Sequence, residues 1–442
     1  MTLRHPLDNK IWGIAWPAIL SNISIPLLGL VDAAILGHLG SNRYLGAVAI
    51  GSALLSFLYW GFGFLRMGTT GLVARAMGAN DPDGAQLVLA QSCVLALMLA
   101  AMVWLLHPLW LSFGFALMAP RESVLPLAES YAAIRIASAP AVLLTYAVVG
   151  WCIGRQNTRW PLLIVVSTNV ANILLDFILV LGLDMLSDGA ALATVLSEYL
   201  GCVLALFAVW RVHPQRPDRN FLQALLRWSG YQQLLRANRH LFVRTICLLG
   251  SFAFFTAAGD KLGGDILATN ALLMQLLFFS AYAMDGFAFA AEGLTGQRLG
   301  ARDMPGFYDA VRRCGFWCSL AAALISLLFL LCKAPLFDLL TNLDTVRALL
   351  DEYVWWLVLM PLAAGPSYLL DGVYIGSGET RQMMLTMLVS AGLVYLPAWY
   401  FTQSWGNHGL WFAFVLFNAA RGLTLYYSYY RMSKYHRWLP AN

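Results

Sequence analysis

Twelve long apolar runs, separated by short polar segments, dominate the chain. A helix needs about 20 apolar residues to cross a hydrocarbon core about 30 Å thick. The apolar residues follow one another continuously, whereas the strands of a membrane β-barrel alternate with a period of two. The pattern therefore predicts an all-α polytopic membrane protein with twelve transmembrane helices. The runs lie near residues 11–36, 46–74, 87–113, 124–154, 160–182, 189–211, 240–258, 266–297, 312–332, 348–376, 382–404 and 409–430.

The composition supports the same class. Of the 442 residues, 60% are hydrophobic and 12% are charged, and the mean hydropathy is +0.67. Soluble domains have roughly 45–50% apolar and about 25% charged residues. So few charges could not cover a soluble surface, which excludes a soluble nucleic-acid binder. The seven cysteines contain no C-x₂-C pair and the seven histidines no pair at metal-ligand spacing, so we expect no cofactor and no metal.

Basic residues are distributed unevenly between the two sides of the predicted membrane. Nineteen Lys and Arg lie in the two termini and in the loops on their side, against five in the loops of the opposite side. Because positive charge favours cytoplasmic loops, we expect both termini in the cytoplasm. The longest polar connection, 213–239, is predicted to be a basic cytoplasmic linker that carries an amphipathic helix. It separates an N-terminal lobe, 1–212, from a C-terminal lobe, 240–442.

Two motifs recur at a constant offset of 222 residues. Six predicted helices separate each motif from its copy, so the two copies have the same orientation in the membrane. Parallel repeats of this kind are one of the plans of secondary transporters, which bind substrate between two lobes. The repeat therefore favours transport, although a channel could also use it. GLVARAMGANDPDG at 71–84 matches GLTGQRLGARDMPG at 293–306, and YAVVGWCIGRQNTR at 146–159 matches YLLDGVYIGSGETR at 368–381.

Ionisable residues inside the runs are candidates for function, because each costs a few kcal/mol on insertion scales. The fifth run carries Asn169, Asn172 and Asp176 at spacings of three and four, which places all three on one helical face. Hydrogen bonds between helices could account for the asparagines. They account less well for Asp176, whose charge adds to the cost. Three others near the cytoplasmic helix ends are expected to reach the interface with their long side chains: Arg66, Arg244 and Glu292.

Counting along the helices brings further polar residues to the depth of Asp176. Asp176 lies 16 residues, or about 24 Å, from the cytoplasmic start of its run, and Thr194 lies about 7 Å from the outer end of the next run. Asp32 lies near the outer end of the first run, which Pro17 and Pro26 interrupt and can bend. Two carboxyl groups in one dry pocket can bind and release protons. The same oxygens could ligate Na⁺, so the residue types leave the coupling ion open.

The chain resembles the multidrug and toxic compound extrusion (MATE) family, in its bacterial DNA-damage-inducible branch. The resemblance covers nearly the whole sequence. It implies two six-helix lobes around an outward-opening cavity in the bacterial inner membrane. It also implies export of drugs and other toxic organic compounds, often cationic, in exchange for entering H⁺ or Na⁺. The most telling stretches are VDAAILGHLG (31–40), FLRMGTTGLVARAMGA (64–79), NVANILLDF (169–177) and DGFAFAAEGLTGQRLGARD (285–303).

The resemblance also assigns roles to residues. It implies a cation site formed by Asp32, Asn172, Asp176 and Thr194. It implies that the first helix bends at Pro17 when the site is protonated. From the residues themselves we add Pro26 as a second bending point and Asn169 as a supporting polar group. The Na⁺-coupled branch has a carboxylate in helix 7, whereas 241–259 contains none, which favours H⁺ as the coupling ion.

Two other functions fit the sequence less well. A flippase for a lipid-linked precursor would be expected to place a cluster of cations in its cavity, and only Arg135 and Arg421 lie at a suitable depth. A membrane-embedded enzyme would need a catalytic constellation, and the sequence has none of the hydrolase or nucleotide-binding motifs. We therefore expect a monomeric antiporter without enzyme activity. Its partners would be small-molecule drugs and membrane lipids, with no nucleic acid.

Overall fold

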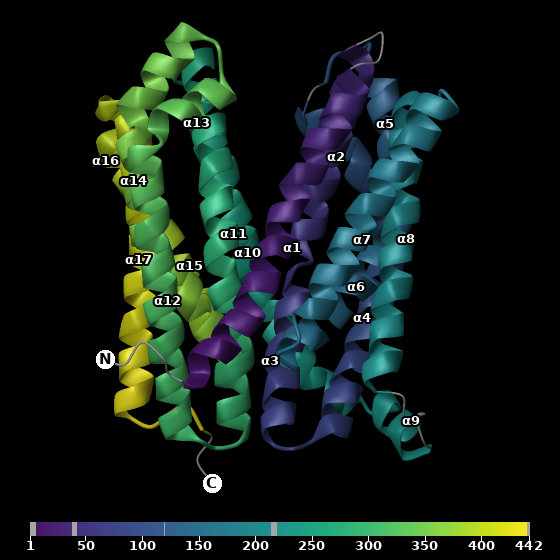
Figure 1. Ribbon diagram of the computed structural model, residues 1–442, viewed down its shortest axis with the longest axis vertical. Coiled ribbons are helices and arrows are strands. Elements are labelled where there is room, and N and C mark those ends of the chain that lie inside the picture. The colour runs from purple at the N-terminus through teal and green to yellow at the C-terminus, as the bar shows by residue number, and fades with distance from the viewer. Residues whose placement is uncertain (1–5, 38–41, 119, 214–218, 440–442) are drawn as a thin grey trace. The chain divides into compact units, whose positions relative to one another are not determined.

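The computed structural model describes residues 6–37, 42–118, 120–213 and 219–439, and in these ranges the chain forms helices and no strand (Figure 1). This confirms the all-α class. The described residues exclude Arg4, Arg216 and the end of the stretch VDAAILGHLG. The first half comprises α1 (Pro6–Gly37), α2 (Asn42–Gly61), α3 (Phe64–Gly78), α4 (Pro82–Met118), α5 (Leu125–Arg135), η1 (Ile136–Ser138), α6 (Ala139–Gly154), α7 (Arg159–Asp176), the π-helical η2 (Phe177–Gly182) and α8 (Leu186–Val212).

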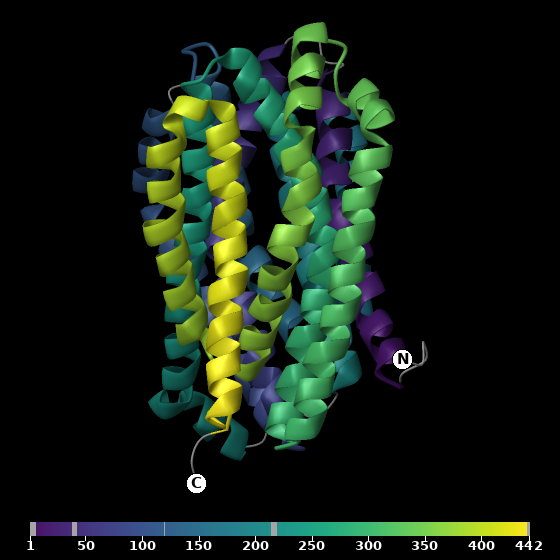
Figure 2. The ribbon, with the colours of Figure 1, turned by 90° about the vertical axis from the view of Figure 1, so that its left-hand side faces the viewer.

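The second half repeats this succession of long helices. It comprises α9 (Arg219–Leu226), α10 (Trp228–Asp260), α11 (Gly264–Gly300), α12 (Met304–Leu331), α13 (Lys333–Leu340), α14 (Asp344–Ser377), α15 (Thr380–Val389), the π-helical η3 (Ser390–Tyr395), α16 (Leu396–Thr402), η4 (Gln403–Trp405) and α17 (Asn407–Lys434). In Figure 2, α17 is the yellow helix in front, and it packs against α14 and η3.

Eleven helical segments of the described chain are long and apolar enough to cross a membrane. They coincide in order with the first eleven apolar runs of the sequence. The twelfth run corresponds to α17, which spans 28 residues. Tyrosines and basic residues lie near the end of α17. The protein is therefore a multi-pass membrane protein.

The helix boundaries reproduce the 222-residue repeat. The helices α4 and α12 begin at positions that differ by that number, Pro82 and Met304, and α7 and α15 begin at Arg159 and Thr380, which differ by one residue less. Glycine contacts repeat as well. A Cβ on Gly150 would overlap the carbonyl oxygen of Arg66, and a Cβ on Gly372 would overlap that of Ala288, which lies 222 residues after Arg66. The two halves thus fold alike, as a parallel repeat requires.

One helix crossing joins the two copies of the first repeated motif. A Cβ on Gly78 would overlap the carbonyl oxygen of Gln297, and a Cβ on Gly300 would overlap that of Arg75. Since Gly300 and Gln297 are the repeat equivalents of Gly78 and Arg75, the contact is reciprocal. Without side chains at the glycines, the backbones of α3 and α11 approach closely, as small residues permit at membrane helix crossings.

The described chain divides into two compact units, and each unit is made of stretches that are not continuous in the sequence. One contains residues 20–73 and 82–235, and the other contains 1–19, 74–81 and 236–442. The lobe boundaries predicted from the sequence, 1–212 and 240–442, remain predictions. Within the predicted linker 213–239, the amphipathic helix is limited to α9. Residues 228–239 instead form the polar beginning of α10, which continues as one helix into the seventh apolar run.

The first residues of α1 are held by a buried polar clamp. Asp8 accepts a hydrogen bond from Arg313 Nη2 at 2.7 Å and another from Trp317 Nε1 at 3.0 Å, and both partners lie on α12. Trp12 follows one turn later and packs edge-on against the Trp317 ring. Asp8 is 7% exposed, so the ion pair is shielded from water. This clamp fixes the beginning of α1 within its unit.

The core of the same unit is aromatic. The Phe255 ring centroid lies 4.9 Å from those of Trp411 and Phe414, and all three side chains are buried. Tyr395 of η3 and Phe417 of α17 extend this cluster. Edge-on and tilted ring pairs of this kind add to the stability that apolar burial provides.

Removal of the Asp303 side chain should weaken the start of α12. The carboxylate accepts from the Gly306 N–H at 2.9 Å and from Arg298 at 2.7 Å. We expect Asp303→Ala to lower the free energy of unfolding by about 1 kcal/mol, measured as the thermal unfolding midpoint in detergent. The Gly306 N–H and Arg298 hold the pKa of the Asp303 carboxyl below its usual range. Its contribution is therefore present above the pKa of the unfolded state and is lost as the pH falls through the folded value.

The matched variant Asp303→Asn separates the two contributions. It keeps an acceptor for the Gly306 N–H but removes the charge, so we expect a smaller loss of stability. The contribution of residue 303 to the free energy of unfolding should then no longer change as the pH falls. An alanine variant as stable as the unmodified protein at neutral pH would contradict the capping role.

Candidate functional site

Asp32, Asn172, Asp176 and Thr194 lie together in one compact unit. Asp32 comes from α1, Asn172 and Asp176 from α7, and Thr194 from α8. The Asn172 amide is oriented by its partners: its nitrogen donates to Asp176 Oδ2 at 3.0 Å and to Asp32 Oδ1 at 3.3 Å, and its oxygen accepts from Thr194 Oγ1 at 3.1 Å. One carboxyl oxygen of Asp32 and one of Asp176 thus converge on the same amide nitrogen. The structure therefore places Asp32, Asp176 and Thr194 around the amide of Asn172, as predicted from the sequence. The role of the four residues remains a prediction.

The two α7 residues of the cluster are buried, and the helix changes form next to them. Asn172 is fully buried and Asp176 is 2% exposed. Asp176 is the last α-helical residue of α7, and the chain continues as the π-helical η2. Single π turns inside helices are frequent at functional sites, because they free backbone groups and shift side chains. Within the described chain, Asp176 Oδ1 is buried without a hydrogen-bond partner. The cluster thus retains an unused acceptor.

Asn169 holds a second contact between the same two helices. Its amide nitrogen donates to the carbonyl oxygen and to the hydroxyl of Ser24, each at 3.1 Å. Ser24 lies two residues before Pro26, which lacks an N–H and leaves the Asn22 carbonyl without its helical donor. The supporting polar residue predicted from sequence is therefore bound to the part of α1 that precedes Asp32. The structure does not test whether Pro17 and Pro26 act as bending points.

The second half of the chain has no counterpart of this cluster. The positions 222 residues after Asp32, Asn172, Asp176 and Thr194 are occupied by Phe254, Val394, Ala398 and Leu416, all apolar. The two halves share their helices and their glycine contacts but not this chemistry. A function that depends on the four polar residues belongs to the first half alone.

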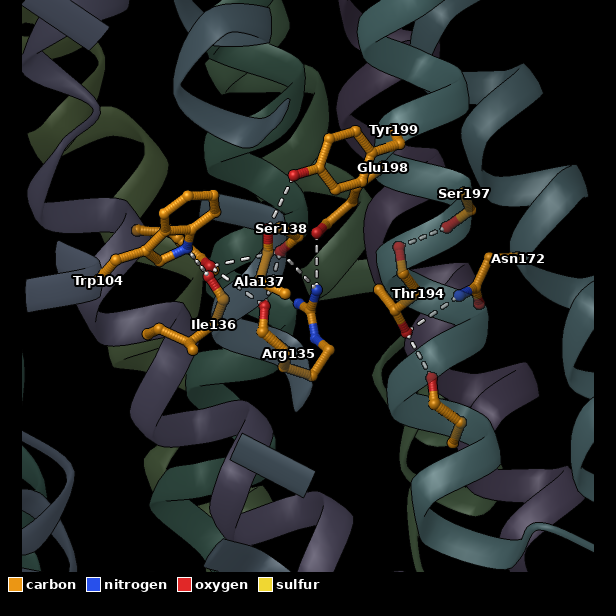
Figure 3. Close-up of polar contacts among 12 residues, drawn as sticks. Trp104, Arg135, Ile136, Ala137, Ser138, Asn172, Thr194, Ser197, Glu198 and Tyr199 are labelled. Atoms are coloured by element: carbon orange, nitrogen blue, oxygen red, sulfur yellow. Dashed lines mark hydrogen bonds and ion pairs between the residues drawn. The ribbon is translucent and has the colours of Figure 1, made fainter. Parts of the chain in front are cut away.

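A second polar group begins one helical turn after Thr194 on α8, at Glu198 (Figure 3). Arg135 Nη1 donates to Glu198 Oε2 at 2.7 Å and to the Ser138 hydroxyl at 3.3 Å. Thr194, Ser197, Glu198 and Tyr199 follow one another on α8, so this helix carries residues of both polar groups. Arg135 interacts electrostatically with Asp32 as well. The guanidinium is therefore paired with a carboxylate in the same unit as the cluster.

The other compact unit contains a buried carboxylate with two guanidiniums. Asp371 Oδ2 on α14 accepts from Arg421 Nη2 at 2.8 Å and also from Arg244 Nη2. Arg421 further donates to Asn418 at 3.1 Å. All three charged residues are 7% exposed or less. Two cations bind Oδ2 of this acid, so its negative charge is already neutralised.

These ion pairs were not predicted from the sequence, and two predictions about charged residues at helix ends were wrong. Arg244 and Glu292 were expected to reach the interface from helix ends, but they are 7% and 1% exposed. For Arg244 the reason is that α10 begins at Trp228, sixteen residues earlier, which places the guanidinium about 24 Å along the helix. The two predicted cavity residues, Arg135 and Arg421, are both paired with a carboxylate. Their pairing weighs against a cationic cluster for a pyrophosphate.

The chain is similar in sequence to known membrane transport proteins of one family. The MatE family model matches residues 17–178 and 241–401. The chain is 40% identical over 435 residues to the DNA damage-inducible protein F of Escherichia coli, covering 98% of this chain and 94% of the relative. It is 21% identical to the probable multidrug resistance protein NorM of Thermotoga maritima, covering 88% and 84%.

Solved structures agree on the fold. The Vibrio cholerae MATE transporter VcmN in its bent form matches with a TM-score of 0.85 and 22% identity, over 98% of both chains. A MATE protein in the straight conformation matches with a TM-score of 0.85 and 20% identity over the same share. That fold has twelve transmembrane helices in a parallel repeat. The family model matches more than half of the chain, and the Escherichia coli relative is 40% identical over nearly the whole of it. These two findings establish that this chain belongs to the MatE family of MATE transporters.

Proposed function

We propose that the protein is a proton-coupled antiporter that exports organic, often cationic, compounds by alternating access. It would work in the bacterial inner membrane with both termini in the cytoplasm, and it would be a transporter without enzyme activity. Asp32 and Asp176 bind the coupling proton, and Asn172 and Thr194 hold the two carboxyl groups in place. Asn169 supports α1, and Pro17 and Pro26 allow that helix to bend.

The convergence of the Asp32 and Asp176 carboxyl groups on the amide nitrogen of Asn172 carries the proposal. Two carboxylates held this close repel each other when both are ionised, so the pair favours a state in which one of them holds a proton. The pair is therefore an arrangement that stores a proton and becomes mutually repulsive when the proton leaves. Because Asp32 stands on α1 and Asp176 on α7, protonation state and the contact between these two helices are linked.

The distribution of acids favours H⁺ over Na⁺. Residues 241–259, where the Na⁺-coupled branch has a carboxylate, contain none. In the orientation of the Asn172 amide that pairs all of its atoms, its N–H groups face both carboxyl groups. The Asp371 carboxylate is also a poor candidate for a sodium site, since Arg244 and Arg421 already bind it.

Relatives support the class of cargo. One is named a probable multidrug resistance protein, and the human relative, 23% identical over 91% of this chain, is named multidrug and toxin extrusion protein 1. The pairing of Arg135 and Arg421 with carboxylates leaves the polar interior better suited to cationic organic compounds than to a pyrophosphate.

Transport in proteoliposomes tests the coupling ion. We expect purified protein to move a fluorescent organic cation when a pH gradient is imposed. A Na⁺ gradient at fixed pH and zero membrane potential should give transport no faster than in protein-free liposomes. The opposite result, transport with the Na⁺ gradient and none with the pH gradient, would overturn proton coupling. Replacing the dye by a fluorescent lipid-linked pyrophosphate tests the flippase alternative in the same vesicles.

A further inference from the structure

A pocket of about 430 Å³ lies between α15 and α17. It is of the size of small-molecule sites in proteins. From α15 it is lined at spacings of three and four by Gln382, Leu385, Thr386 and Val389, and from α17 at the same spacings by Thr424, Tyr427, Ser428 and Arg431. One face of each helix therefore borders the pocket. Ser428 and Gln382 connect the two helices across it at 3.5 Å.

The pocket changes from polar to apolar along its length. At the beginning of α15 it is lined by Glu379 and Gln382, together with Arg431 and Arg437 from the last turns of α17 and beyond. Leu385 and Val389 lie further along α15. Glu379 and Val389 are ten residues apart, which corresponds to about 15 Å of helix. A ligand that fills the pocket must therefore have a charged end and an apolar end.

The polar end has an excess of positive charge. Arg431 and Arg437 contact tyrosine rings, and within the described residues neither guanidinium has a carboxylate within ion-pair distance. Burial raises the pKa of the Glu379 carboxyl, and Arg75 acts in the opposite direction. Arg75 also donates to the Ser377 carbonyl at 3.4 Å, so it lies at this end of α14. The lining of the pocket thus contains one carboxyl group and two guanidiniums, with the Arg75 guanidinium near this end of α14, and this excess of positive charge favours an anionic ligand.

The surroundings place the pocket at the level of lipid headgroups. Tyr426, Tyr427 and Tyr430, in the last turns of α17, are more than half exposed. Tyrosines gather at the boundary between headgroups and hydrocarbon in membrane proteins. Leu385 and Val389 are each 40% exposed, and in a membrane such side chains face acyl chains. Basic pockets between transmembrane helices at this level are suited to anionic lipid headgroups.

We propose that this pocket binds an anionic phospholipid, with the phosphate on Arg431 and Arg437 and an acyl chain along Leu385 and Val389. This site lies in the other compact unit from Asp32 and Asp176, and it does not depend on the coupling ion. A free phosphate ion would satisfy the guanidiniums but would leave the apolar half of the pocket empty. The observations therefore favour the lipid, and the test below separates the two sources of phosphate.

Native mass spectrometry of the full-length protein measures the retained lipid. The protein is equilibrated in detergent with phosphatidylglycerol or with phosphatidylcholine of the same acyl chains. We expect phosphatidylglycerol to be retained preferentially, and Arg431→Gln/Arg437→Gln to weaken its retention about tenfold or more, because two basic contacts near the surface are removed. The control Arg302→Gln/Arg312→Gln removes the same charge from two exposed residues of the same unit outside the pocket and should retain the lipid.

Two further variants keep the test independent of folding and of the phosphate source. Arg431→Lys/Arg437→Lys keeps the charges and should restore most of the binding. Leu385→Trp should fill the apolar half and displace the lipid, and excess inorganic phosphate should not compete with it. Equal retention of the two lipids, an equal effect of the control pair, or displacement by inorganic phosphate would each overturn the proposal.

Discussion

We expect Asp32→Asn to abolish export driven by a pH gradient while the protein remains folded. Asparagine has nearly the shape of a protonated aspartic acid and can donate to Asp176, but it cannot release a proton. The variant would therefore remain in the arrangement of the protonated pair. We expect dye transport in proteoliposomes to fall to the level of protein-free liposomes. The free energy of unfolding should change by no more than about 1 kcal/mol, because the asparagine keeps the shape and the hydrogen-bonding capacity of the protonated acid.

A matched substitution controls for the loss of a carboxylate. Asp265 is exposed in the first turn of α11, so Asp265→Asn should transport at the rate of the unmodified protein. Pro17→Ala should slow transport without changing the two acids, since it restores an N–H to α1. If Asp32→Asn transports the dye at the unmodified rate when equal amounts are reconstituted, then Asp32 is structural and the proposed mechanism fails.

Adding a side chain at either glycine of the reciprocal crossing of α3 and α11 should lower the free energy of unfolding more than the other substitutions proposed. A Cβ on Gly78 or Gly300 would overlap a carbonyl oxygen of the opposite helix, and a backbone cannot rotate away as a side chain can. We expect Gly78→Ala and Gly300→Ala each to lower the free energy of unfolding by about 2 kcal/mol or more. The measurement is the thermal unfolding midpoint of the purified protein in detergent.

The control for these variants is a glycine in open space. A Cβ on Gly250, inside α10, would meet no atom within 4 Å. Gly250→Ala should therefore be neutral or stabilise the protein by up to about 1 kcal/mol, since alanine is the better helix former. Because the crossing is reciprocal, we expect the Gly78 and Gly300 variants to resemble each other. If Gly78→Ala and Gly300→Ala are as stable as Gly250→Ala, then the two helices can move apart without a loss of stability and the prediction is wrong.

Sequence reasoning predicted the fold well, because the information lies in local patterns. Each apolar run marks one helix, and the constant offset of the motifs reappears in the helix boundaries. The candidate cluster was also accessible from sequence. Helical spacing puts Asn172 and Asp176 on one face, and counting residues brings Thr194 to the same depth. Asp32 joins them in the structure, although whether these residues couple transport to protons stays a prediction.

The ion pairs were not accessible from sequence. Asp8 and Arg313 are separated by 305 residues, and Arg244 and Asp371 by 127. Nothing in a local pattern says which distant charges meet when helices pack. The expectation for Arg244 failed for a further reason, since a polar beginning hid the first twelve residues of α10 and moved the apparent helix end toward the arginine. Hydropathy locates the apolar part of a helix, not its full length.

The reciprocal glycine contact has the symmetry of an isologous dimer, in which each subunit offers the same patch to the other. In such a dimer every substitution appears twice and the two subunits stay identical. Two copies joined in one polypeptide are free to diverge while the shared contact persists. One copy can keep an acidic pair and its amide, and the other can hold hydrocarbon side chains at the same positions. Covalent fusion thus allows a symmetric scaffold to respond to an ion on one side only.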